Sequence, residues 1–181
     1  MALSKIVNGG VAASGIPSGG IIQIQRTQYT STTSTSCADA SNVSLDHLAV
    51  SITPTSTNSI IRLEAQLVGE WNNQNVSYNS NWFFYRDSTK LGHATAGSRN
   101  VGVFMSTHTS YDSVDQASTP EGVFYSYFDT PSTTSTITYK VGVNQGNSAT
   151  YIWYTNRTVT DTDDKVYERG ISFISATEIA G

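Results

Sequence analysis

Two Thr-Pro corners, about 77 residues apart, constrain the fold more than any other feature of the sequence. Thr53–Gln66 reads TPTSTNSIIRLEAQ, and Thr130–Val143 reads TPSTTSTITYKVGV. In each, Thr-Pro precedes a run of Ser, Thr and Asn and then a segment of alternating apolar residues. Proline cannot donate a hydrogen bond within a sheet, so Pro54 and Pro131 are expected to end a strand or mark a corner. The hydroxyl groups that follow can satisfy the backbone of the turn.

Alternation of apolar and polar residues predicts strands from Gly20 onward. In the segment 60–71, Ile61, Leu63, Ala65 and Leu67 are expected to point inward, with polar residues between them. Other strands are expected at 20–28, 48–53, 101–107, 122–129, 136–144, 149–156 and 171–180, and a hairpin turning at Asp87–Thr89 within 82–95. The chain is therefore predicted to be all-β. The duplicated corners favour a double Greek key, which is the architecture of a jelly-roll β-sandwich.

Composition and charge exclude several classes of partner. The net charge is −4 and no Lys/Arg cluster occurs, so binding to nucleic acid is not expected. No apolar run approaches the roughly 20 residues that span a bilayer, so membrane insertion is not expected either. The single Cys37 permits neither an internal disulfide nor a thiolate metal site. No metal and no cofactor is expected.

The first 19 residues differ from the rest of the chain. They are rich in glycine, weakly apolar, and followed by an alternating segment that starts at Gly20. Such a segment is too small to fold alone and is expected to become ordered against a partner. We therefore divide the chain into an N-terminal arm, 1–19, and a sandwich domain, 20–181. A merely flexible terminus is the alternative interpretation of the arm.

The final segment, ISFISATEIAG, is apolar on both faces. One face carries Ile171, Phe173 and Ile179, and the other carries Ile174, Ala176 and Ala180. A strand of this kind is expected to be buried on both faces. Two interpretations fit equally well: a strand in the middle of the core of one chain, or a strand whose second face contacts another subunit.

Several motifs resemble a family of bacteriophage tail-fibre and appendage proteins, common in phages of aquatic bacteria. They are MALSKIV, GGIIQIQRTQ, SITPTSTNSIIRL, FYRDSTKLG, YSYFDTPSTTSTITYKV and ATEIAG. The similarity extends from Gly20 to Gly181, and the Thr-Pro corners and TEIAG are its most specific parts. The layout of this family is similar to the trimeric jelly rolls of the tumour-necrosis-factor and complement-C1q type.

The resemblance implies a homotrimer with the C-terminal strand near the threefold axis. It also implies that the arm docks the trimer to a tail or capsid protein of the virion, and that the protein helps the phage to attach to its host. A capsid or neck decoration protein is the nearest alternative. A glycan-binding, lectin-like or C1q-like module and a glycan depolymerase are the others.

No motif for catalysis is evident, and an enzyme is not expected. Glycan hydrolysis requires two carboxylates at a fixed separation. The candidate carboxylates lie outside any recognisable motif: Glu70, Asp87, Asp112, Asp115, Glu121 and Asp129. The nucleophile motif G-x-S-x-G is absent. The acidic segment Thr160–Glu168 lacks the Gly and Glu of a calcium loop, so a polar hairpin tip is the preferred interpretation.

Two long loops with aromatic residues are the candidates for binding a host surface glycan. They are Glu70–Asn81 and Ser106–Glu121. Trp71, Tyr78 and Tyr111 could stack on sugar rings, while His108 and Asp112 could form hydrogen bonds with a ligand. Alternatively, these aromatic side chains pack within their own loops or at a subunit interface.

Overall fold

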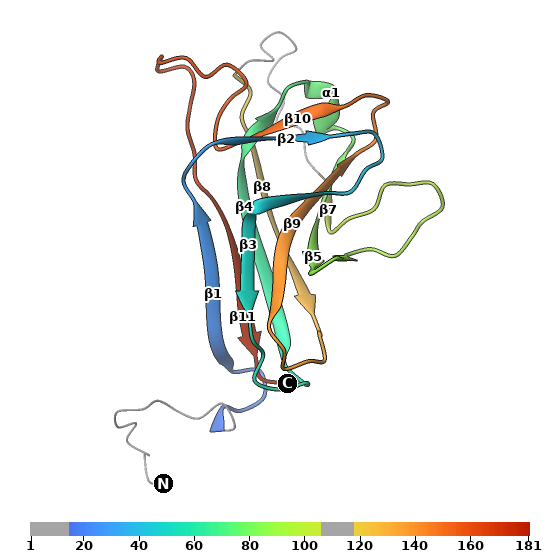
Figure 1. Ribbon diagram of the computed structural model, residues 1–181, viewed down its shortest axis with the longest axis vertical. Coiled ribbons are helices and arrows are strands. Elements are labelled where there is room, and N and C mark those ends of the chain that lie inside the picture. Colours follow the sequence, from blue (N-terminus) through green and yellow to red (C-terminus); the bar gives the residue numbers. More distant parts are fainter. Residues whose placement is uncertain (1–14, 106–117) are drawn as a thin grey trace.

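Antiparallel strands make up nearly all of the regular structure. The computed structural model describes residues 15–105 and 118–181, and these contain eleven strands and one helical turn (Figure 1). They are β1 (Ile21–Tyr29), β2 (Thr33–Cys37), β3 (Val43–Ile52), β4 (Ile60–Trp71), α1 (Gln74–Ser77), β5 (Ser80–Arg86), β6 (Thr89–Leu91), β7 (Phe104–Met105), β8 (Glu121–Asp129), β9 (Ile137–Gln145), β10 (Tyr151–Thr155) and β11 (Ser172–Ile179). The predicted all-β class is confirmed. The sequence did not predict β2, because TSTSC lacks apolar alternation.

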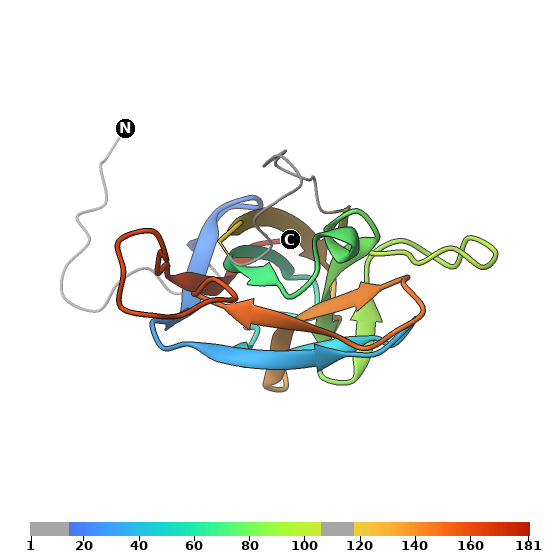
Figure 2. The same cartoon turned by 90° about the horizontal axis from the view of Figure 1, so that it is seen from above.

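The strands form two antiparallel sheets that pack face to face as a sandwich. Sheet A has the order β1-β11-β4-β10-β2, with β8 paired to β4. Sheet B has the order β3-β9-β5-β6, with β7 paired to β5. The ribbon of β2 and β10 crosses one end of the sandwich in Figure 1, and the view from above in Figure 2 shows the same crossing.

The core lies between the two sheets and follows the predicted alternation of β4. The inward-facing residues of this strand are fully buried: Ile61, Leu63, Ala65 and Leu67. Near the end of β4, Trp71, Trp82 and Trp153 pack against one another with ring centroids 5.0 to 6.3 Å apart. This aromatic cluster joins both sheets, because Trp82 lies on β5 and the other two lie on β4 and β10. It closes the core at that end.

Both Thr-Pro corners connect one sheet to the other. Residues 53–59 lead from β3 in sheet B to β4 in sheet A, and residues 130–136 lead from β8 in sheet A to β9 in sheet B. The two corners touch, since the Oγ1 atoms of Thr53 and Thr136 share a hydrogen bond of 2.7 Å. The prediction that Pro54 and Pro131 mark corners is confirmed.

The two ends of the sandwich differ in what they contain. The corner end holds residues 53–59, 130–136 and 178–181, and the loop end holds residues 72–79, 146–150 and 156–171 (Figure 1). Residues 15–20 lie at the corner end, where the N–H of Gly19 donates to the carbonyl of Ala180 (2.7 Å). The first 14 residues of the predicted arm lie outside the described residues.

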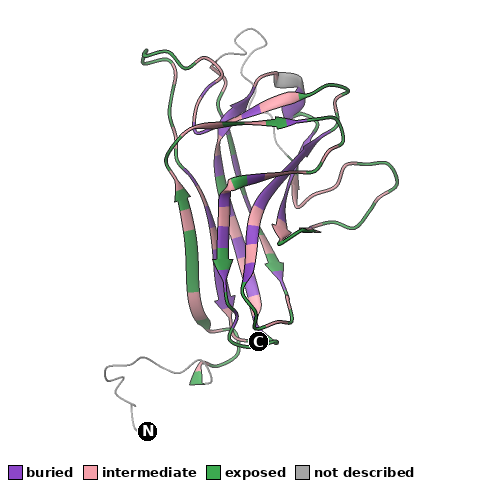
Figure 3. Cartoon of the chain, viewed as in Figure 1, coloured by how far each residue is buried: buried purple, intermediate pink, exposed green. Residues whose placement is uncertain are grey.

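The final strand occupies an interior position of sheet A. β11 pairs with β1 on one side and with β4 on the other. Its side chains alternate as predicted: Ile174 and Ala176 are buried in the core, whereas Phe173 and Ile179 on the opposite side are only half-buried. The interpretation as a strand enclosed on both faces by its own chain is therefore wrong for the outer face. Figure 3 shows that the neighbouring strand, β1, is exposed along much of its length.

Candidate functional site

Large apolar side chains lie exposed on the outer face of sheet A. Cross-strand pairing places two rows on this face: Ile24, Thr177, Arg62 and Phe128 in one, and Gln28, Phe173, Gln66 and Phe124 in the other. Ile24, Phe124 and Phe128 are 57%, 58% and 59% exposed, and Phe173 is half-buried. We call these four residues the apolar face. Clusters of large exposed apolar residues are unusual on monomers and mark contact surfaces.

Polar groups lie within these two rows and also form a third row between them. Register places Arg26, Ser175, Glu64 and Ser126 side by side across β1, β11, β4 and β8. The guanidinium of Arg62 contacts the carboxylate of Glu64 at 3.1 Å. A shallow hollow of about 280 Å³ runs beside them, lined by Ile24, Arg26, Gln28, Phe173 and Ser175. Exposed apolar side chains interspersed with polar groups suit a specific protein interface, because the polar groups fix the register of the partner.

The outer face of sheet B is polar by contrast. Ser51 and Thr138 share a hydrogen bond of 2.8 Å across β3 and β9, and Lys140 pairs with Asp46 at 2.8 Å. Two large aromatic residues lie there. Phe83 is fully buried, with the ammonium of Lys90 4.2 Å from the centre of its ring, and Tyr85 is half-buried against it with ring centroids 5.2 Å apart. Apart from Tyr85 and the exposed Met105, this face presents mainly polar groups to water.

At the loop end, the carboxyl group of Glu121 is buried beside the aromatic cluster. The hydroxyl of Ser77 in α1 donates to its Oε1 atom at 2.5 Å, while its Oε2 atom has no partner among the described residues. Burial raises the pKa of Glu121 to about 7, and nearby Glu70 adds to this rise. The hydrogen bonds from Ser77 and the backbone of Trp71 oppose it.

The neighbouring carboxylate, Glu70, is held by donors from two loops. The backbone N–H and the hydroxyl of Thr119 donate to its Oε1 atom at 2.9 and 2.6 Å, and the N–H of Val159 donates to Oε2 at 2.7 Å. Glu70 therefore fastens residues 118–120 and 156–160 to the end of β4. These contacts are structural, since they use both oxygens of the carboxylate.

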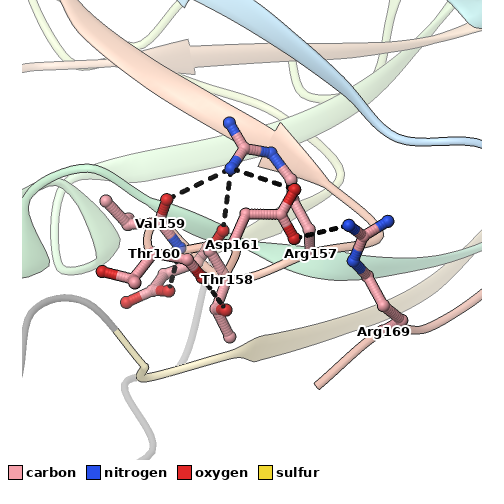
Figure 4. Close-up of polar contacts among 7 residues, drawn as sticks. Arg157, Thr158, Val159, Thr160, Asp161 and Arg169 are labelled. Carbon is pink, nitrogen blue, oxygen red and sulfur yellow. Dashed lines mark hydrogen bonds and ion pairs between the residues drawn. The ribbon is translucent and has the colours of Figure 1, made fainter. Parts of the chain in front are cut away.

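The acidic segment 160–168 is stabilised by ion pairs, as Figure 4 shows. Asp161 contacts Arg169 at 2.6 Å and Arg157 at 3.7 Å. Arg157 also donates to the carbonyls of Thr158 and Val159 at 3.3 and 3.1 Å. The carboxylate of Asp161 is thus neutralised within the chain, which agrees with the interpretation of this segment as a polar loop.

Of the residues predicted to bind a glycan, the structure describes Trp71 and Tyr78, and their surroundings differ. Trp71 is 1% exposed and packs in the aromatic cluster, so the stacking role predicted for it is wrong. The physical reason is that Trp71 is the last residue of β4 and points into the core, as the strand period requires. Tyr78 is 57% exposed at the loop end, and its binding role stays a prediction. His108, Tyr111 and Asp112 lie outside the described residues.

The two described histidines have different surroundings. His47 packs against the ring of Tyr29 with centroids 4.6 Å apart, and its Nε2 atom lies 3.0 Å from the hydroxyl of Thr155. Burial lowers the pKa of His47, which favours the neutral ring. His93 is exposed in the segment between β6 and β7, where it borders two hollows of about 470 and 590 Å³. Sequence reasoning did not find these hollows, because their walls come from distant segments.

The described carboxylates that were considered for catalysis accept hydrogen bonds from neighbouring donors, although one oxygen of Glu121 has no partner among the described residues. Asp129 accepts hydrogen bonds from Arg86 (3.0 Å) and from the hydroxyl of Tyr139 (2.7 Å). Asp87 accepts one from the backbone of Thr138 at 3.0 Å. With Glu70 and Glu121 at the loop end, these groups are divided between opposite ends of the sandwich. Asp112 and Asp115 lie outside the described residues.

At the corner end, Glu178 of the TEIAG motif binds the first Thr-Pro corner. Its Oε1 atom accepts hydrogen bonds from the N–H of Thr55 (2.7 Å), the hydroxyl of Thr55 (2.8 Å) and the hydroxyl of Ser59 (2.6 Å). Its Oε2 atom accepts one from Gln23 (2.7 Å). Burial raises the pKa of Glu178, but these hydrogen bonds together outweigh it and hold the pKa below its ordinary value.

Comparison with known proteins adds no family assignment. No protein-family model matches the chain, and a search of curated proteins finds no match. In the described ranges, no helix has the length and apolar character needed to cross a membrane. The function proposed below therefore rests on the residues, their geometry and the motifs of the sequence.

Proposed function

We propose that this protein is a non-enzymatic structural protein of a bacteriophage virion. It forms a homotrimeric tail-fibre or fibre-tip appendage that helps the particle to adhere to its host. The observation that carries the proposal is the apolar face, which lies on the sheet that contains the C-terminal strand. The motifs shared with phage appendage proteins supply the biological setting.

The strand order supports a jelly roll. With β7 and the ribbon of β2 and β10 set aside, eight strands remain. The first pairs with the eighth (β1 and β11), the second with the seventh (β3 and β9), the third with the sixth (β4 and β8), and the fourth with the fifth (β5 and β6). This nested pairing is what results when one long antiparallel ribbon is rolled into two Greek keys.

The apolar face supports association through sheet A. Ile24, Phe124, Phe128 and Phe173 expose apolar surface that gains free energy when it is removed from water, about 25 cal/mol per Å² buried. The outer face of sheet B carries fewer such residues among those described, since Phe83 is buried, Tyr85 is half-buried and Met105 alone is exposed. Three copies that meet through sheet A would place β11 near a threefold axis and leave sheet B in water.

The two ends of the sandwich support a division between attachment and adhesion. Residues 15–20, which follow the rest of the proposed arm, lie at the corner end. The longer loops lie at the opposite end (Figure 1). An appendage anchored through the corner end would present the loop end to the host. Loops on a β scaffold commonly carry recognition.

Sedimentation equilibrium tests the trimer. The purified protein at micromolar concentration is expected to have three times the 19.5 kDa mass of one chain. Phe128→Lys is expected to dissociate it, because three ammonium groups would then be buried in the interface. Ser51→Lys is the matched control, since Ser51 is an exposed strand residue on the outer face of sheet B. A monomeric wild type, or a Phe128→Lys variant that stays trimeric, would contradict the proposal.

Labelling of intact particles tests the place of the protein in the virion. A gold-tagged antibody against the protein is expected to decorate the tail or its fibres in electron micrographs. Label spread over the capsid or confined to the neck would instead support a decoration role. The absence of label from the tail, the capsid and the neck would contradict a structural role in the virion. Particles grown with a chain that lacks residues 1–19 test the arm, because they are expected to lose the label.

A further inference from the structure

The segment between β6 and β7 forms an organised loop on the side of sheet B. At the base of this loop, the N–H of His93 donates to the carbonyl of Gly102 at 3.2 Å. Gly92 there has a φ of 127°, a conformation that other residues rarely adopt. At the tip, Ala96 and Arg99 pair across a turn that contains Gly97, whose φ is 64°. The loop projects from the sandwich away from β1, as Figures 1 and 2 both show.

A hollow of about 470 Å³ lies between this loop and the end of sheet B. Its volume is within the range of small-molecule sites, roughly 300–1,000 Å³. Its lining joins segments far apart in the sequence: Asn42 before β3, Lys90 in β6, His93, Arg99 and Asn100 in the loop, and Asn144 in β9. We call it the amide hollow.

The basic residues of the amide hollow have no acidic partners among the described residues. Of the nine Lys and Arg among the described residues, five form ion pairs with a carboxylate within 4.0 Å. The other four are Arg26, Lys90, Arg99 and Lys165, and two of these, Lys90 and Arg99, line this one hollow. No Asp or Glu of the described chain is part of its lining. In a chain with a net charge of −4, this concentration of unneutralised positive charge favours an anionic ligand.

The amide groups add hydrogen-bonding capacity beside that charge. The Oδ1 atom of Asn42 accepts from the ammonium of Lys90 at 2.9 Å and from the amide of Asn144 at 3.0 Å, which orients all three side chains. An ammonium has three N–H donors, so Lys90 retains donors for a ligand. The Oδ1 atom of Asn144 is buried and has no partner among the described residues. A buried acceptor without a partner is unusual and is satisfied when a ligand donates to it.

We propose that the amide hollow binds one carboxylate-bearing sugar unit of an acidic polysaccharide. Lys90 and Arg99 bind the carboxylate, with His93 beside them, and Asn42, Asn100 and Asn144 exchange hydrogen bonds with ring hydroxyls. Positive charge alone would suit any anion, but amides that both donate and accept match the hydroxyl groups of a sugar. A bare sulfate, which carries no O–H group at neutral pH, would leave the Asn144 acceptor without a donor.

The position of the hollow is compatible with the proposed trimer. It is built on sheet B and its adjoining loop, whereas the apolar face lies on the outer side of sheet A. The hollow therefore stays open when sheet A is covered. Its biological meaning, recognition of a charged host glycan, rests on the proposed adhesion function, but the binding chemistry does not depend on it.

Titration calorimetry with defined oligosaccharides tests the proposal. Tetragalacturonate is the charged probe, maltotetraose the neutral one, and sodium sulfate and sodium phosphate the small anions. Tetragalacturonate is expected to bind, and Arg99→Gln and Lys90→Gln are each expected to weaken its affinity at least tenfold. Lys165→Gln, which removes an exposed cation elsewhere, is expected to leave the affinity within about twofold. Arg99 is exposed on the loop, so its variant is expected to keep the fold.

Several results would overturn the proposal. They are the absence of binding, equal affinity for maltotetraose, equal affinity for sulfate or phosphate, or unchanged affinity in Arg99→Gln. The mass of each sample, measured by sedimentation, distinguishes failure of the sugar site from failure of the trimer. A trimer that fails to bind the charged sugar rejects only the ligand site. A monomer that binds it with the expected dependence on Arg99 rejects only the trimer.

Discussion

The corner end and the loop end each bury a glutamate, and they hold it in opposite ways. Glu178 at the corner end accepts four hydrogen bonds, which keep its pKa below the ordinary value despite burial. Glu121 at the loop end has one oxygen without a partner among the described residues, and burial raises its pKa to about 7. Burial raises the pKa at both sites and hydrogen-bond donors lower it, but the donors outweigh burial only at Glu178.

This difference extends to the neighbouring polar groups. The Nε1 atoms of Trp71 and Trp153 are also buried without partners in the described part of the loop end, near Glu121. The corner end instead links its segments through the hydrogen bonds of Glu178 and the contact between the two Thr-Pro corners. One end is built for stability, and the other retains unused hydrogen-bonding groups. Neutralising the two buried glutamates, Glu178 and Glu121, is therefore expected to change stability in opposite directions.

The largest effect is expected for Glu178→Gln at the corner end. In wild type, the donors around Glu178 face carboxylate oxygens. In the variant, the amide N–H groups of Gln would face some of these donors, so the variant is expected to lose about 3 kcal/mol of unfolding free energy. The loss is measured by urea denaturation at pH 7 and fixed protein concentration. Glu168→Gln, an exposed position, is the control and is expected to change stability by less than about 0.5 kcal/mol.

The pH dependence of Glu178→Gln sharpens this prediction. Because the folded pKa of Glu178 is lowered, its contribution is present above the ordinary value of 4.5 and is lost as the pH falls through the folded pKa. The difference between wild type and variant should therefore shrink below pH 4.5. A difference that is constant down to pH 2 would show that the carboxylate charge does not matter.

The opposite sign is expected for Glu121→Gln at the loop end. The folded pKa of about 7 lies above the ordinary 4.5, so wild type loses stability as the pH rises through this window. The neutral variant avoids that loss and is expected to be more stable by about 2 kcal/mol at pH 8. The gain in unfolding free energy should approach zero at pH 4, where the wild-type carboxyl group is largely protonated in both the folded and the unfolded protein. A destabilised variant at pH 8 would instead indicate that the charged form is bound by a partner.

The sequence predicted the strands and corners because these depend on local pattern. Alternation places Ile61 and Leu63 inside, and the missing backbone N–H of proline keeps Pro54 and Pro131 out of strand interiors. β2 escaped prediction, since TSTSC is held by pairing with β10 and not by apolar alternation of its own. The contact between Glu178 and Ser59, 119 residues apart, likewise depends on the assembled fold.

The candidate sites were less predictable than the fold. Trp71 was predicted both as the end of the strand 60–71 and as part of the binding loop 70–81, and the strand assignment is the correct one, because β4 turns the ring inward. The amide hollow could not be predicted, because Asn42, Lys90 and Asn144 meet only when β3, β6 and β9 are in place. The signal that identifies the hollow is the meeting of Lys90 and Arg99 without an acidic partner among the described residues, and this signal exists only in the assembled fold.

A smaller effect is expected for Asp161→Asn at the loop end. The substitution removes the charge that pairs with Arg157 and Arg169, and these pairs are partly exposed (Figure 4). Partly exposed pairs of this kind contribute little, so the loss is expected to be about 1 kcal/mol and to decrease with added salt. Asp163→Asn, on the same loop and exposed, is the control. Equal effects of the two substitutions in urea denaturation would show that the ion pairs do not stabilise the loop.

The smallest effect is expected at the contact between the two corners. The Oγ1 atoms of Thr53 and Thr136 share an exposed hydrogen bond, so Thr53→Val and Thr136→Val are each expected to cost about 0.5 kcal/mol. A double-mutant cycle in urea denaturation isolates the pair, and the double variant is expected to lose less than the sum of the two single variants. Strict additivity would mean that the corners fold independently. A coupling energy would instead show that the duplicated motif acts as one unit that closes the corner end, while Glu178 fastens the last strand beneath it.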